Sequence, residues 1–200
     1  MQAKERLSPG VVASVAVILF AVFSFAGWLY ETVDNVFTFG GLYLRASLML
    51  PWCPIYGIGG LLIVALLEPL RQRLVARTTK PVEVVVMSIA IYALTALVEL
   101  AGSYVCEALM GYVPWDYSQA WLNFDGRIAP QYTLRFVLLG LVALYVVFPR
   151  VRRWAAGHQR AAALCACALA ALFALDNALQ GLGVWAPVKD ALTPLGIRHW

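Results

Sequence analysis

The sequence predicts an all-α fold, a polytopic bundle of about five transmembrane helices in a single integral membrane domain over residues 1–200. The chain is 62% hydrophobic and only 13% charged, whereas soluble domains carry about 25% charged residues. Side chains of this composition cannot cover the whole surface of a protein in water. The apolar runs also reach the length of about 20 residues that a membrane-spanning helix needs. We therefore expect the lipid bilayer to surround the chain.

The basic side chains are distributed as expected for an oriented membrane protein. Ten of the 15 lysines and arginines lie in three short segments beside the apolar runs: Lys4, Arg6, Arg71, Arg73, Arg77, Lys80, Arg150, Arg152, Arg153 and Arg160. Cytoplasmic loops of membrane proteins are enriched in lysine and arginine. The pattern predicts a cytoplasmic N-terminus and an external C-terminus. It also explains the net charge of +4 without a nucleic-acid partner.

Five apolar segments are predicted to cross the membrane: residues 11–32, 54–70, 82–108, 131–149 and 161–180. The tail over residues 181–200 is interrupted by glycine and proline, so we expect it to lie along the outer surface rather than to form a sixth span. The two predicted outer loops contain Trp52, Trp115 and Trp121. Tryptophan is typical of the aromatic belt at a membrane–water interface.

Small residues recur on the fifth predicted span. Alanine occupies every fourth position at Ala162, Ala166, Ala170 and Ala174, and such rows let helix backbones approach closely in lipid. The row predicts a packing face, either inside the bundle or between protomers of a homo-oligomer.

Charged residues inside the predicted spans are candidate functional groups, because they are costly in lipid. Five such residues fall in the outer half when residues are counted from the span ends: Glu31, Glu99, Glu107, Asp176 and Arg135. Two interpretations remain open at this point. The residues form structural ion pairs, with Arg135 neutralising Glu99 or Asp176, or they line an outward-facing polar cavity that binds a ligand.

Glu68 lies instead at the predicted inner end of the second span. Arg71 and Arg73 follow it within a turn and a half. The sequence therefore predicts an interfacial ion pair there.

Metal and cofactor chemistry has no support in the sequence. The two histidines, His158 and His199, are not spaced with cysteines or acids as metal ligands are, and no phosphate-binding GxxxxGK[ST] loop occurs. An intramembrane enzyme acting on a lipid-linked substrate, with Glu99 or Asp116 as general base, would lack a nucleophile–base pair. We therefore assign no catalytic residue, no metal and no cofactor.

The entries to the second and fourth spans resemble each other. Pro54-Ile55-Tyr56 opens one and Pro130-Gln131-Tyr132 opens the other, and a glutamate, Glu31 or Glu107, precedes each proline by the same interval. The pattern favours a parallel repeat of two helical hairpins. The stretch LPWCPIYGIGG over residues 50–60 predicts an irregular helix start facing the polar groups, because irregular backbone in lipid must be shielded by protein or line a wet cavity.

Several short motifs occur in a specific order between about residues 20 and 150: FAGWLYE at 25–31, PWCPIYGIG at 51–59, ELAG at 99–102, WDYS at 115–118 and NFDGRI at 123–128. In this combination the chain resembles the bacterial membrane family labelled "putative ABC-transporter type IV", the CmpB-like permeases. The resemblance implies a transporter or permease-type component of the bacterial cytoplasmic (inner) membrane.

The leading functional hypothesis is therefore a component that binds a small solute from outside. The predicted binding residues are Glu31, Cys53, Tyr56, Glu99, Trp115, Asp116, Tyr117, Asn123, Arg127 and Arg135. A separate ATP-binding subunit would supply any energy and would dock at the basic loops over residues 71–80 and 150–160. The alternative hypothesis is a structural or regulatory membrane partner, in which the acids only brace the bundle.

Overall fold

A computed structural model describes residues 7–39, 43–44, 49–113, 115–193 and 198–199. Lys4, Arg6, Pro194 and Trp200 lie outside the described residues, so the predictions that include them are not addressed. The chain is helical, as predicted, and the described residues contain one small parallel pairing of β1 (Tyr43–Leu44) with β2 (Arg198–His199).

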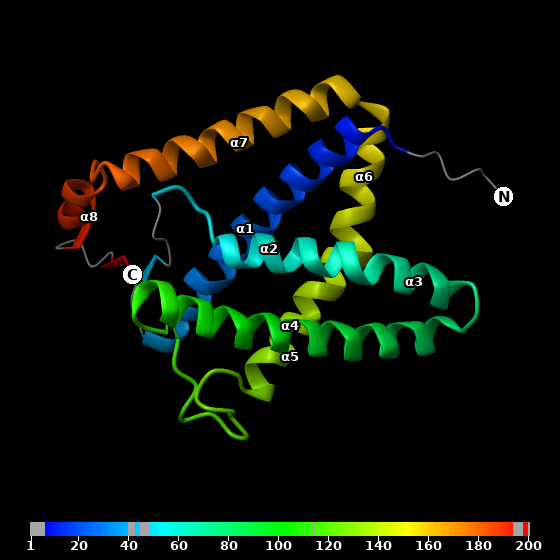
Figure 1. Ribbon diagram of the computed structural model, residues 1–200, viewed down its shortest axis with the longest axis horizontal. Helices are drawn as coiled ribbons and strands as arrows, with labels where there is room; N and C mark the ends of the chain where they lie inside the picture. The colour runs from blue at the N-terminus through cyan, green and yellow to red at the C-terminus, as the bar shows by residue number, and fades with distance from the viewer. Residues whose placement is uncertain (1–6, 40–42, 45–48, 114, 194–197, 200) are drawn as a thin grey trace. The chain divides into compact units, whose positions relative to one another are not determined.

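The helices follow the predicted apolar segments (Figure 1). Their bounds are α1 (Pro9–Phe39), α2 (Pro54–Leu62), α3 (Glu68–Val75), α4 (Lys80–Met110), α5 (Pro130–Val142), α6 (Phe148–Gly157), α7 (Gln159–Gly181) and α8 (Ala186–Leu192). Among the described residues, five helical stretches are long and apolar enough to span a membrane: Pro9–Thr38, Pro54–Val75, Lys80–Leu109, Pro130–Gly157 and Gln159–Gly181. The prediction of five spans is confirmed.

The second and fourth spans each contain a short π-helical segment. These are η1 (Ile63–Leu67), between α2 and α3, and η2 (Ala143–Val147), between α5 and α6. Each begins six residues before a proline, Pro69 or Pro149. Proline has no N–H and its ring collides with the carbonyl four residues earlier, so a locally widened helix relieves the clash. The two spans thus share a π-helical segment at the same distance before a proline.

The chain divides into two compact units. The first consists of Met1–Leu61 together with Pro149–Trp200, and the second is Leu62–Phe148. Each unit has its own internal packing.

In the first unit, α1 packs along α7 (Figure 1). Ala162 and Ala166 are buried in this unit, whereas Ala170 and Ala174 are exposed. The small-residue row thus contributes to packing within the bundle over its first half only. A second close approach joins α1 to α2, because a Cβ added at Gly27 would overlap the Tyr56 ring.

The core of the second unit forms where the two π-helical segments meet α4. Ile63 and Leu67 of η1, Leu144 of η2, and Met87 and Ile91 of α4 make one buried cluster. These apolar side chains pack against one another, and Leu70, Leu94 and Val137 pack around them.

Candidate functional site

The candidate site in the second unit is built by α4, the start of α5 and the loop between them. Gly111 ends α4 in a left-handed conformation, φ 78°, and its N–H donates to the carbonyl of Glu107 at 2.9 Å. Glycine adopts this conformation without steric cost. The loop then runs to Pro130, which starts α5 at a position where a missing N–H costs nothing.

The loop is held together by its own polar side chains. The Asn123 amide donates to the carbonyls of Ser118 and Ala120 at 3.1 and 2.9 Å, and its oxygen accepts the N–H of Gly126 at 3.0 Å. The Asp116 carboxylate accepts the N–H of Ser118 at 2.8 Å, and this bond lowers the pKa of Asp116. Asn123 and Asp116 were both predicted to bind solute, and in the structure their side chains hydrogen-bond within the loop and stabilise its fold.

Trp115 also stabilises the fold of the loop. Its indole N–H donates to the carbonyl of Arg127 at 2.8 Å, which ties the two ends of the loop together. The NFDGRI stretch at 123–128 forms a tight turn closed by a bridge between Phe124 and Ile128. The sequence motifs that carry the resemblance thus encode a defined loop structure.

Arg127 fastens the loop to α4. Its guanidinium contacts Glu107 at 2.6 Å and Asp125 at 3.0 Å, and donates to the Ser103 hydroxyl at 3.3 Å. It also lies over the Tyr104 ring at 4.1 Å. The hydrogen bond to Glu107 is the main cause that raises the pKa of Arg127.

Tyr117 brings the loop to Glu99. Its hydroxyl donates to one Glu99 oxygen at 3.3 Å, and the Thr133 hydroxyl of α5 donates to the other at 3.0 Å. The Tyr117 ring stacks on Tyr132, with centroids 4.2 Å apart. Glu99 is only 8% exposed, so the loop and α5 together cover a carboxylate inside an apolar span.

Three of the α4 residues that the loop contacts share one face of the helix. Glu99, Ser103 and Glu107 are spaced four residues apart, and residues at this spacing are neighbours on a helix surface. The loop therefore lies along the last turns of α4. Sequence reasoning did not identify Thr133 and Tyr132 as site residues; the only signal was their place just after Pro130.

Arg135 contacts an aromatic ring of its own helix. Its guanidinium lies 5.2 Å from the centroid of the Tyr132 ring, and its side chain is exposed. The structure gives Glu99 two neutral hydroxyl donors where an ion pair with Arg135 was expected. Arg135 nevertheless belongs to the same end of α5 as Tyr132 and Thr133.

The remaining predicted residues meet in the first unit. The Tyr56 hydroxyl donates to Glu31 at 2.9 Å, and the Cys53 N–H donates to the Ser24 carbonyl at 3.1 Å. The Cys53 thiol is not in a disulfide. A hollow of about 320 Å³ in this unit is apolar and is lined by α1, α2, α7 and Trp52. None of the predicted binding residues lines it.

Asp176 of α7 acts as an anchor within the first unit. It is 1% exposed and accepts the N–H groups of Met49 and Leu50 at 3.3 and 3.0 Å. The Trp185 indole donates a third hydrogen bond at 2.9 Å. These donors compensate the buried carboxylate, so Asp176 holds the segment that leads into α2.

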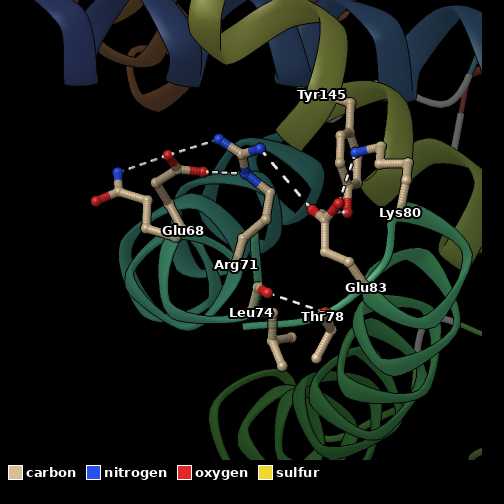
Figure 2. Close-up of polar contacts among 8 residues, drawn as sticks. Glu68, Arg71, Leu74, Thr78, Lys80, Glu83 and Tyr145 are labelled. Atoms are coloured by element: carbon tan, nitrogen blue, oxygen red, sulfur yellow. Dashed lines mark hydrogen bonds and ion pairs between the residues drawn. The ribbon is translucent and has the colours of Figure 1, made fainter. Parts of the chain in front are cut away.

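A second polar cluster lies at the other end of α4 and is shown in Figure 2. Glu68 contacts Arg71 at 2.7 Å, which confirms the predicted ion pair. Figure 2 also shows Arg71 pointing between Glu68 and Glu83. Glu83 contacts Lys80 at 2.6 Å and accepts the Tyr145 hydroxyl at 2.7 Å.

Glu83 was missed by sequence reasoning. It lies in the first turn of α4, three residues after Lys80, where a glutamate is usually a solvated surface residue. In the structure it is only 1% exposed. One of its hydrogen-bond partners, Tyr145, lies 62 residues further along the chain.

A comparison with protein families agrees with the resemblance. The family model described as "Putative ABC-transporter type IV" matches residues 18–180. The match includes α7, beyond the stretch covered by the short motifs. No curated protein and no solved structure matches the chain.

Proposed function

Because the chain belongs to the family described as "Putative ABC-transporter type IV", we propose that it is a permease-type component that binds a small solute from outside the cell. Its five apolar helices fit a membrane component. In this proposal the solute binds at Glu99, beneath the loop between α4 and α5. The bacterial cytoplasmic membrane is the proposed location, with the N-terminus inside.

The observation that carries this proposal is the environment of Glu99. A carboxylate within an apolar span is costly and is usually functional. In the described part of the chain, the partners of Glu99 are the hydroxyls of Tyr117 and Thr133, and no basic side chain pairs with it. Tyr117 belongs to a loop rather than a helix, so a movement of the loop would uncover Glu99 for a solute from the same side.

A second group of solute-binding residues is proposed in the first unit, formed by Glu31, Tyr56 and Cys53. The hydrogen bond between Tyr56 and Glu31 lies where α2 begins with Pro54 and approaches α1 closely at Gly27. Both groups lie close to the first turn of a span that opens with proline.

Energy coupling is proposed to come from a separate ATP-binding subunit, because the sequence has no phosphate-binding loop. The turn between α3 and α4 supports a docking surface. Arg71 and Lys80 are engaged by Glu68 and Glu83, whereas Arg73 and Arg77 are exposed. The basic segment over residues 150–160 is the second proposed contact. The exposed small residues of α7 are the proposed contact for a homo-oligomer.

A structural or regulatory role is the second candidate. It is favoured by Arg127, whose guanidinium is bound by Glu107, Asp125 and Ser103. Such a saturated contact stabilises a loop whether or not a solute binds. The two candidate functions make different predictions for Glu99. Solute binding requires its carboxylate, whereas in a structural role the carboxylate contributes only to stability.

A thermal-stability screen of the full chain in lipid nanodiscs would separate the two candidates. Small cationic, anionic, zwitterionic and neutral solutes are added in turn to the wild type, to Glu99→Gln and to the control Glu83→Gln. A solute at 100 times its dissociation constant stabilises the folded state by about 2.7 kcal/mol. We expect one class to raise the melting temperature of the wild type and of Glu83→Gln, but not of Glu99→Gln.

If no solute class stabilises the wild type, or if Glu99→Gln responds as the wild type does, the solute-binding proposal is wrong. The structural role would then be the better account of the buried acid.

A further inference from the structure

The loop between α4 and α5 exposes three large apolar side chains at its end. Trp121, Leu122 and Phe124, here called the loop tip, are 74%, 64% and 57% exposed. The stretch Ser118–Phe124 contains no charged residue. Contiguous exposed apolar surface of this kind marks a site that contacts a protein or a membrane.

The loop tip is exposed by a defined backbone rather than by a lack of structure. Leu122 has φ 52° and Asp125 has φ 55°, in the left-handed region, which is costly for a large side chain such as leucine. Asn123, between Leu122 and Phe124, turns inward and bonds to Ser118, Ala120 and Gly126. The hydrogen bonds of the Asn123 side chain thus stabilise the strained backbone at Leu122, and the apolar side chains remain exposed.

The position of the loop in the chain indicates what the loop tip contacts. The loop follows directly on the span that ends at Leu109 and precedes the span that begins at Pro130. Both ends of the loop therefore lie at the same membrane–water interface, and the exposed Leu109 and Tyr112 continue the apolar surface from α4 toward the loop. Tryptophan is enriched at this depth because its ring is apolar and its N–H can bond to headgroups.

We propose that the loop tip inserts into the bilayer interface on its own side of the membrane. Trp121 lies at the level of the headgroups, and Leu122 and Phe124 contact the upper part of the acyl chains. The position of the loop between two candidate spans favours lipid over a protein partner, because both of its ends lie beside the membrane–water interface. This inference does not depend on the binding of a solute.

Tryptophan fluorescence of the full chain in vesicles tests the proposal. The wild type and Trp121→Phe are reconstituted in phosphatidylcholine, with and without bromine on the acyl chains near the headgroups, and the difference between the two proteins gives the signal of Trp121. We expect brominated lipid to quench most of this signal and aqueous iodide to quench little of it. A Trp121 signal quenched by iodide and unaffected by brominated lipid would overturn the proposal and leave the loop tip as a surface for a protein partner.

A second variant separates membrane contact from folding. Asparagine tolerates the left-handed conformation better than leucine does, so Leu122→Asn removes apolar contact without adding backbone strain. We expect this variant to be at least as stable as the wild type in detergent, with Trp121 less quenched by brominated lipid in vesicles. Unchanged quenching in Leu122→Asn would contradict an inserted loop tip. The control is Gln119→Asn, a change at an exposed polar position in the same loop.

Discussion

Removal of the Tyr145 hydroxyl should destabilise the second unit by a predictable amount. In Tyr145→Phe the ring remains, so its contacts with Lys80 at 4.3 Å and Arg71 at 5.3 Å are kept. Only the hydrogen bond to Glu83, 2.7 Å long, is lost. A hydrogen bond to a charged group contributes about 1.5–3 kcal/mol. Because Lys80 still contacts Glu83 at 2.6 Å, we expect a loss near the lower limit, about 1.5 kcal/mol.

The measurement is equilibrium unfolding in mixed micelles with a denaturing detergent. Tyr92→Phe is the matched control, since Tyr92 is on the same helix as Glu83 and no hydrogen bond of its hydroxyl is found among the described residues. A double-mutant cycle with Glu83→Gln should give a coupling of about 1 kcal/mol or more, as for residues in direct contact. If Tyr145→Phe is no less stable than Tyr92→Phe, or if the coupling is near zero, the assignment of Glu83 to a buried network is refuted.

Three further predictions concern packing, pH and topology. Gly27→Ala should destabilise the first unit by about 1–3 kcal/mol through overpacking, because the added Cβ would overlap a tyrosine ring. Gly59 has open space around it, so Gly59→Ala should stabilise the helix by about 0.5–1 kcal/mol. Unfolding in denaturing detergent measures both changes. The pKa of Asp116 is lowered in the folded chain, so its contribution to loop stability is complete above the unfolded pKa of about 3.9 and is lost as the pH falls through the folded pKa. The protection factor for hydrogen exchange of residues 116–126, which is the intrinsic rate at each pH divided by the observed rate, should therefore be unchanged from pH 7 to pH 5 and smaller at pH 3. Equal protection factors at pH 3 and pH 7 would contradict the prediction. In whole cells, Val75→Cys should resist a membrane-impermeant thiol reagent that labels Tyr112→Cys; both side chains are exposed, so the reverse result would invert the proposed orientation.

The hydrogen-bond network of the candidate site was only partly predictable. The motif residues Trp115, Tyr117, Asn123 and Arg127 were identified from the resemblance, but the structure gives most of them a role in the loop rather than in an open cavity. Counting residues from the span ends predicted that Glu99 lies near this loop, and Tyr117 of the loop contacts it. It could not give the direction in which a side chain leaves its helix, and this direction decides between Thr133 and Arg135 as partner.

The sequence by itself determined the features that depend on local composition. Apolar length predicted the five spans, because each helix satisfies its own backbone hydrogen bonds and needs only enough apolar residues to cross lipid. Spacing within one turn predicted the pair of Glu68 with Arg71. Proline predicted where α2 and α5 begin.

Only the tertiary structure decided the contacts between distant segments. Tyr145 and Glu83 are 62 residues apart, and Thr133 and Glu99 are 34 residues apart. The rotation of each helix about its axis selects such partners, and it follows from the combined packing of side chains such as Ile63, Met87 and Leu144. In an almost uniformly apolar span the hydrophobic pattern hardly distinguishes one face from another, so the rotation cannot be read from the sequence.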